Sequence, residues 1–178
     1  MPNKGNIDLE TLQRNIQYME DVTKHLKETE RIDGNVRSVQ FGPWVYFEDL
    51  DSNYIISRHE CGKWMYFFSN MSFADEICKK AIKDHIVTSC KHSNDETGVC
   101  CFYINGNDMV AHKRVIAFFI DNGLIRKTKS GNFYNISFKF DDQTSAGEYA
   151  SNSELKVKEF QATLKLDNFI DLKTGKWI

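Results

Sequence analysis

Short apolar runs that are rich in aromatic residues, each bounded by turn-forming residues, constrain the fold of this chain more than any other feature. The first of them occupy residues 36–41, 44–47, 54–56 and 63–68. Runs of this length and composition predict β-strands, and the Gly, Pro, Asn and Asp residues between them predict tight turns. Strands joined in this way favour an antiparallel sheet.

The later part of the chain continues the same pattern. We expect strands over residues 99–104, 123–128, 133–140 and 155–166, with a polar loop over residues 142–154. The turn residues Ser130, Gly131 and Asn132 predict that the second and third of these strands form a hairpin.

Three segments have helical periodicity. Residues 72–87 begin with Ser72 as a candidate N-cap, and residues 109–122 end at Gly123, a candidate left-handed cap. The third segment, residues 7–31, carries an apolar stripe at steps of three and four residues, formed by Leu9, Leu12, Ile16, Met19, Val22 and Leu26. Because this stripe is too apolar to leave in water, we expect the helix to cap the sheet rather than to stand out as an arm.

These elements predict an α+β fold, with a curved antiparallel β-sheet backed by helices on one face. The length of 178 residues suits one domain, over residues 35–178, preceded by an amphipathic helical extension over residues 1–34. The net charge of −2 argues against a general attraction to nucleic acids or anionic membranes. The chain start lacks an apolar signal core, and the five cysteines follow no disulfide spacing, so we expect a cytoplasmic protein with free thiols that does not enter membranes.

A set of short motifs points to a family. Gly62-Lys63-Trp64 is followed by Asp75 at a helix start and by Cys90-Lys91-His92-Ser93. Further on come residues 134–141, with the sequence YNISFKFD, and then Thr144, Gly147 and Tyr149. This order resembles a little-characterised family of eukaryotes and bacteria whose bacterial members are labelled phosphothreonine lyase domain proteins. The resemblance implies a bacterial protein and a fold similar to that of the mRNA cap-binding translation initiation factor.

The resemblance also implies a phosphate chemistry. A phosphothreonine lyase removes phosphate by β-elimination, which requires a base, an acid and cations that hold the phosphate. The family likeness assigns Lys91 or Lys139 as the base and His92 as the acid, with Lys63 as a further cation. The chain does not contain a complete lyase motif. The alternative interpretation is that these lysines are ordinary surface residues of strands.

Ligand binding without catalysis is the second interpretation. Trp44 follows a turn and is a candidate for stacking on a nucleotide base, whereas Trp64 lies in an apolar strand and is expected in the core. Arg126 begins a basic run at the predicted hairpin, and Asp141 and Tyr149 belong to the family-like motif, so we include them as ligand-binding candidates.

The histidines and cysteines have none of the spacings typical of zinc sites, and no phosphate-binding glycine loop is present, so we expect no metal and no cofactor. The sequence thus predicts a domain that binds a phosphorylated peptide or a nucleotide on a cationic sheet face. RNA is an alternative ligand, a phosphothreonine lyase-like enzyme is an alternative function, and so is a small inhibitor or adaptor, such as mobile elements encode, that contacts a protein through the N-terminal helix.

Overall fold

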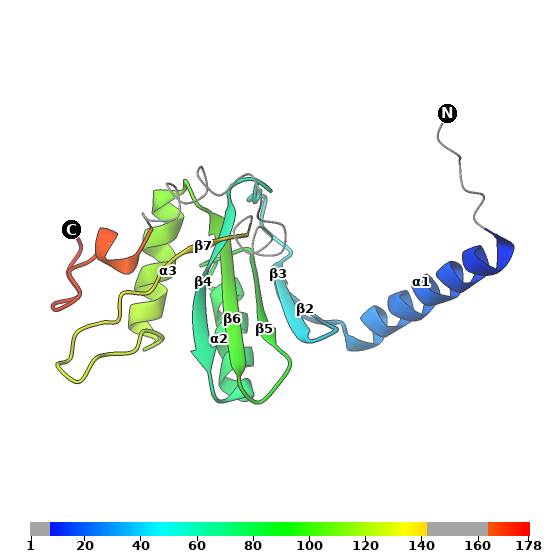
Figure 1. Cartoon of the computed structure of the whole chain (residues 1–178), viewed down its shortest axis with the longest axis horizontal. Coiled ribbons are helices and arrows are strands. Elements are labelled where there is room, and N and C mark those ends of the chain that lie inside the picture. The colour runs from blue at the N-terminus through cyan, green and yellow to red at the C-terminus, as the bar shows by residue number, and fades with distance from the viewer. Residues whose placement is uncertain (1–7, 142–163) are drawn as a thin grey trace.

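The computed structural model describes residues 8–141 and 164–178 and has the predicted α+β architecture (Figure 1). Its antiparallel sheet has the strand order β1-β2-β3-β5-β6-β4-β7. The strands are β1 Arg31–Asp33, β2 Val36–Phe41, β3 Trp44–Asp49, β4 Cys61–Phe68, β5 Ser89–Ser93, β6 Gly98–Asn105 and β7 Lys139–Phe140. The helices are α1 Leu9–Thr29, α2 Met71–Lys83, α3 Met109–Asp121 and a 3-10 turn, Leu166–Asn168.

The hydrophobic core lies between one face of the sheet and the helices α2 and α3. Alternate residues of the strands, such as Phe47, Trp64 and Phe102, point toward the helices and are fully buried. The rings of Phe102 and Phe119 of α3 pack edge to face at 5.2 Å between centroids. The prediction that helices back one face of the sheet is therefore confirmed for α2 and α3.

A buried polar pair connects α3 to the centre of the sheet. The indole N–H of Trp64 donates to Nδ1 of His112 at 3.0 Å, and Nε2 of His112 contacts the carbonyl oxygen of Gly106 at 2.9 Å. Burial lowers the pKa of His112, which therefore stays neutral, with its proton on Nε2. The expected core position of Trp64 is thus confirmed, and His112 is a structural residue.

Several predicted boundaries differ from the observed ones. Asn70, rather than Ser72, caps α2, because its side chain accepts from the backbone N–H of Phe73. Residues 54–56 form no strand. Their backbone is held by the side chain of Asn105, which donates to the carbonyl oxygen of Ile55 and accepts from the N–H of Ser57. Strand β5 was not predicted, whereas Gly123 has φ +66° and ends α3 as expected.

The predicted hairpin over residues 123–140 is only partly present. A turn closes between Thr128 and Asn132, but pairing between its arms is limited to one bridge, from Lys127 to Phe133. The next backbone groups bond elsewhere, for example Phe138 N–H to the carbonyl of Leu164, so no regular ladder forms. The predicted loop over residues 142–154 and most of the strand over residues 155–166 lie outside the described residues.

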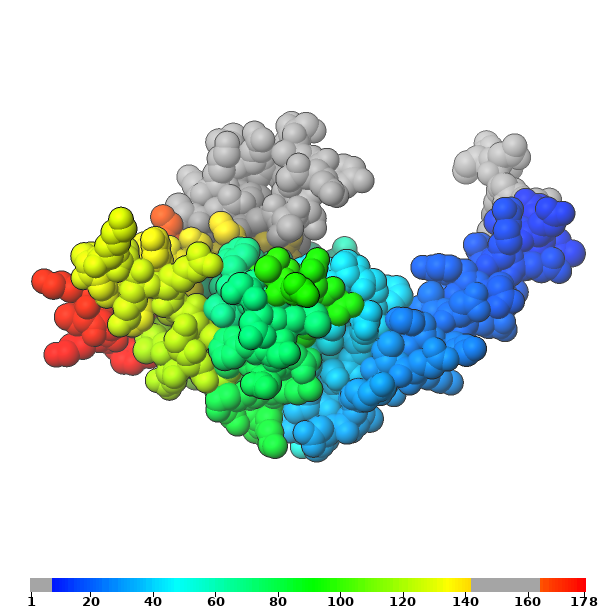
Figure 2. Space-filling model, turned by 90° about the horizontal axis from the view of Figure 1, so that it is seen from below, coloured from blue at the N-terminus to red at the C-terminus, as the bar shows by residue number. Residues whose placement is uncertain are grey.

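The expectation that the first helix caps the sheet is wrong. Helix α1 extends away from the domain and buries none of its residues (Figures 1 and 2). Only its last turn meets β2, where the hydroxyl of Thr29 donates to the carbonyl oxygen of Gln40 at 3.1 Å. Within the described ranges, no helix is long and apolar enough to cross a lipid bilayer.

Candidate functional site

The pairing register gathers three predicted lysines on one face of the sheet. In β4 and β6, Trp64 pairs with Phe102, and both face the helices. The neighbouring residues therefore face the opposite side, since side chains alternate along a strand. This second face carries Lys63, which pairs with Tyr103 on one side and with Lys139 on the other.

Lys91 joins this face from β5. It pairs with Tyr46 of β3 and with Cys101 of β6. Its ammonium group lies 3.9 Å from the ring centroid of Trp44 and 5.5 Å from that of Tyr46, so two aromatic rings hold the charge by cation–π contact. Burial, reinforced by the charge of Lys63, lowers the pKa of Lys91 below its ordinary value. The lysine is thus a partly dehydrated cation on an aromatic platform.

Lys63 is largely enclosed, with 13% of its side chain exposed. Its ammonium group is 2.7 Å from Oδ1 of Asp141 and 5.8 Å from the ring centroid of Tyr103. Lys139, its neighbour across the strand pair, is exposed. In the described part of the chain, Lys63, Lys91 and Lys139 thus share this face with the Asp141 carboxylate, which leaves an excess of positive charge around them. The Arg37–Glu48 ion pair lies on the same face, on β2 and β3.

Two further groups on this face are weak acids held in their neutral form. Burial raises the pKa of Tyr103 well above its ordinary value, and the charge of Asp141 acts in the same direction. Burial also raises the pKa of the Cys101 thiol, although Lys63 and Lys91 oppose the shift. The Tyr103 hydroxyl therefore keeps its proton and can donate a hydrogen bond to an anion.

The structure does not bring His92 to the lysines. His92 points to the helix side of the sheet and is buried, with Nδ1 2.8 Å from the carbonyl oxygen of Ser93 and Nε2 3.5 Å from Oδ1 of Asp75. The hydrogen bond to His92, followed by the one to Lys79, keeps the pKa of Asp75 below its ordinary value. Since alternation separates Lys91 from His92, these neighbours in sequence cannot act on one ligand.

Of the other predicted site residues, Trp44 and Asp141 lie with the lysines, whereas Arg126 lies apart from them. Arg126 is exposed and lines a separate hollow of about 370 Å³ beside β4, with Tyr66, Phe67 and Tyr134 among its walls. Trp44 lies on the lysine face, and Tyr149 falls outside the described residues. Because Trp64 faces the core, Trp44 and Trp64 cannot sandwich a base between them.

Sequence reasoning did not include Tyr46 and Tyr103 in the site. The signal that could have found them is the alternation within residues 44–47 and 99–104, which sets each tyrosine on the face opposite its buried neighbour. None of the five cysteines forms a disulfide, and the Cys61 thiol donates to Oδ2 of Asp141 at 3.4 Å. Cys100 and Cys101 face opposite sides of β6. Among the residues described, no three His, Cys, Asp or Glu side chains are placed to hold a metal ion.

Neither a family model, nor a curated protein, nor a solved structure matches this chain. The family resemblance therefore stays a prediction based on short motifs.

Proposed function

We propose that the lysine face, defined by Lys63, Lys91, Lys139, Trp44 and Tyr103, binds a nucleotide through its phosphate groups and its base. The observation that carries the proposal is that three lysines, from β5, β4 and β7, lie on one side of the sheet, with β6 between the first two strands. Lys63 and Lys139 are direct neighbours across β4 and β7, so their like charges repel one another in the free protein, although Asp141 pairs with Lys63. An anion that binds between them relieves this repulsion, which favours the bound state.

Each group has a separate role in this proposal. Lys63 and Lys139 donate charge-assisted hydrogen bonds to phosphate oxygens, and Tyr103 adds a neutral donor. Lys91 lies on Trp44, so a phosphate that draws the ammonium group away would uncover the indole ring for a base. Stacking on such a ring contributes about 1–3 kcal/mol per base. The site would therefore favour a nucleotide over inorganic phosphate and over an uncharged nucleoside.

Calorimetric titration with ATP and GTP tests the proposal. We expect Lys63→Ala and Lys91→Ala each to weaken nucleotide binding by about 1.5–3 kcal/mol, because each removes a charge-assisted contact. Lys80→Ala is the matched control: this lysine pairs with Asp84 on the surface of α2, and its loss should leave the affinity unchanged. Equal weakening by all three substitutions would show that the effect comes from the total charge of the protein and not from this face. Absence of binding to the unmodified protein would refute the proposal.

One observation favours the lyase as a second candidate. Burial shifts the pKa of Lys91 downward, which is the direction that a lysine base needs, and Lys91 shares its face with Tyr103. In the elimination, Lys91 would take the proton from the α-carbon of phosphothreonine, the bond between the β-carbon and the phosphate oxygen would break, and the phosphate would leave with the bonding electrons. His92 cannot supply the acid from the other face, whereas protonated Tyr103 lies on the correct side.

Mass spectrometry of a phosphothreonine peptide separates the two candidates. A lyase would lighten the peptide by one phosphoric acid and leave a dehydrated threonine, and Lys91→Ala would abolish this product. A binding domain would leave the peptide mass unchanged. We expect the unchanged mass. The acid that the resemblance implied, His92, lies on the opposite face of the sheet from Lys91.

Four further predictions from the sequence stay predictions. A likeness to the cap-binding initiation factor, an RNA ligand, a bacterial origin and a cytoplasmic location are compatible with a nucleotide site on a sheet face, and the proposal does not depend on them. The role of a small inhibitor or adaptor would require a protein surface, for which α1 is the candidate.

A further inference from the structure

Most apolar residues of α1 follow the heptad spacing of a coiled coil. Steps of three and four residues alternate through Leu9, Leu12, Ile16, Met19, Thr23 and Leu26, and the remaining aliphatic residue of the stripe, Val22, lies beside this seam. This repeat of 3.5 residues keeps one seam of a helix turned toward a partner helix. Thr23, the only polar member, donates its hydroxyl to the carbonyl oxygen of Met19 at 2.8 Å, so its polar group is satisfied within α1.

This heptad seam is open to solvent. Leu9 is 69% exposed, Ile16 52% and Met19 60%, although these are among the most apolar residues of the helix. Most of the stability of a helix in a protein comes from packing of its apolar face. The exposed seam of α1 therefore requires a cover from outside the described domain.

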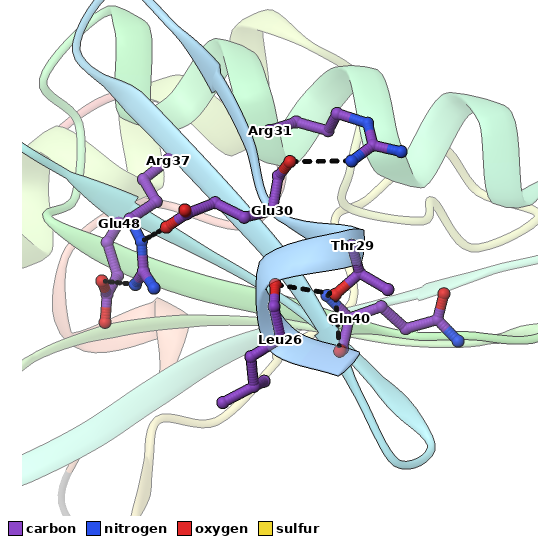
Figure 3. Close-up of polar contacts among 7 residues, drawn as sticks. All are labelled: Leu26, Thr29, Glu30, Arg31, Arg37, Gln40 and Glu48. Atoms are coloured by element: carbon purple, nitrogen blue, oxygen red, sulfur yellow. Dashed lines mark hydrogen bonds and ion pairs between the residues drawn. The ribbon is translucent and has the colours of Figure 1, made fainter. Parts of the chain in front are cut away.

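The joint at the base of α1 holds the helix away from the sheet (Figure 3). Thr29 exchanges two hydrogen bonds with the backbone of Gln40, at 3.1 and 3.3 Å. Arg37 bridges Glu30 and Glu48, which ties the residue after the helix to β2 and β3. Since these contacts set the direction in which α1 leaves the domain, the seam cannot turn back onto the sheet without breaking them.

We propose that α1 pairs with α1 of a second copy of this chain in an antiparallel coiled coil. Charge complementarity selects this partner and this direction. The charges are mixed along the helix, since its C-terminal half carries Glu20, Asp21 and Glu28 as well as Lys24 and Lys27. In an antiparallel pair with Ile16 level with Met19 of the second copy, Asp8 lies level with Lys27 and Arg14 with Asp21, whereas a parallel pair would set every charge level with its own copy.

The packing layers agree with the antiparallel direction. With Ile16 opposite Met19 of the second copy, Leu12 meets Thr23 and Leu9 meets Leu26, so every layer holds at least one large apolar side chain. A parallel pair would instead place Thr23 against itself. The antiparallel pair also keeps the two sheets at opposite ends of the coiled coil, because each domain joins the C-terminal end of its own α1 (Figure 1).

The contact area predicts a weak, reversible dimer. A helix of 21 residues is about 31 Å long. If a third of the surface of each helix is covered, the pair buries on the order of 900 Å², close to the lower limit of about 1,000 Å² for specific interfaces. Self-association should therefore depend on concentration, and the helical signal in circular dichroism should rise with it.

Sedimentation equilibrium of the full chain, from low micromolar to submillimolar concentration, tests the proposal. Ile16→Glu places a charge in each copy of the seam and should weaken the dimer by at least about 100-fold. Tyr18→Glu is the matched control, since Tyr18 is 63% exposed on the same helix but lies outside the seam. Both substitutions should leave the melting temperature of the domain unchanged in dilute solution, because neither residue contacts the core.

Disulfide trapping tests the direction of the pair. When Leu12→Cys and Thr23→Cys chains are mixed under mild oxidation, the antiparallel arrangement predicts disulfides between the two variants. Disulfides within each variant alone would contradict it. A full chain that remains monomeric throughout, or a dimer that Ile16→Glu and Tyr18→Glu weaken equally, would overturn the proposal.

Discussion

Replacing Trp64 by alanine is expected to lower the free energy of unfolding by about 3–5 kcal/mol, the range for loss of a large aromatic side chain from a packed core. Trp64 is fully buried, and its ring contacts His112, Phe138 and Phe169 at centroid distances of 5.7–6.1 Å. The substitution also removes the donor to Nδ1 of His112, which leaves a buried acceptor without its partner.

Urea denaturation of the full chain measures this effect. The control is Trp177→Ala, because Trp177 is 46% exposed near the C-terminus and its loss should cost less than about 1 kcal/mol. Trp64→Phe should be intermediate, since it keeps a ring in the core but loses the hydrogen bond. A loss below 1 kcal/mol for Trp64→Ala would contradict the placement of this indole at the centre of the core.

Replacing Gly62 by alanine should both destabilise the domain and disturb the lysine face. A β-carbon at Gly62 would overlap the ring of Phe138 and would lie 2.8 Å from the backbone carbonyl oxygen of Lys139. Because this oxygen belongs to the backbone, β7 must shift away from β4, and such overpacking typically costs about 1–3 kcal/mol. The shift would also move Lys139 away from Lys63, its partner across the strand pair.

A double-mutant cycle identifies the cause of the loss. Phe138→Val alone should destabilise the domain by removing part of a core ring, but it also makes room beside Gly62. The combined Gly62→Ala and Phe138→Val substitutions should therefore cost less than the sum of the two single changes. Additive costs would exclude a steric conflict with the Phe138 ring, and nucleotide affinity measured on the same variants would report whether β7 positions Lys139.

The candidate site was only partly predictable from the sequence. Periodicity identified most strands, and the motif residues Lys63, Lys91 and Lys139 do share a face. The same reasoning grouped His92 with them, although adjacent residues of one strand point to opposite faces. The alternation of residues 99–104 could likewise have placed Tyr103 on the lysine side of its predicted strand. The separation of Lys91 from His92 follows only once residues 89–93 are known to form β5, and their pairing partners are not visible in the sequence.

Local chemistry in the sequence determined the elements that depend on near neighbours. Turn residues ended the early strands, Gly123 ended α3 in the left-handed conformation, and the apolar stripe specified α1 as an amphipathic helix. These features are encoded locally because hydrogen bonds within a helix or a tight turn connect residues only a few positions apart.

Only the tertiary structure decided which surfaces are covered. The sheet order places β5 between β3 and β6, which brings Lys91 onto Trp44, and the packing of α2 and α3 determines which alternate residues become the core. The contact of Thr29 with Gln40 directs α1 away from the domain. These outcomes depend on contacts between segments far apart in the chain, and an amphipathic pattern shows that a face will be buried but not what buries it.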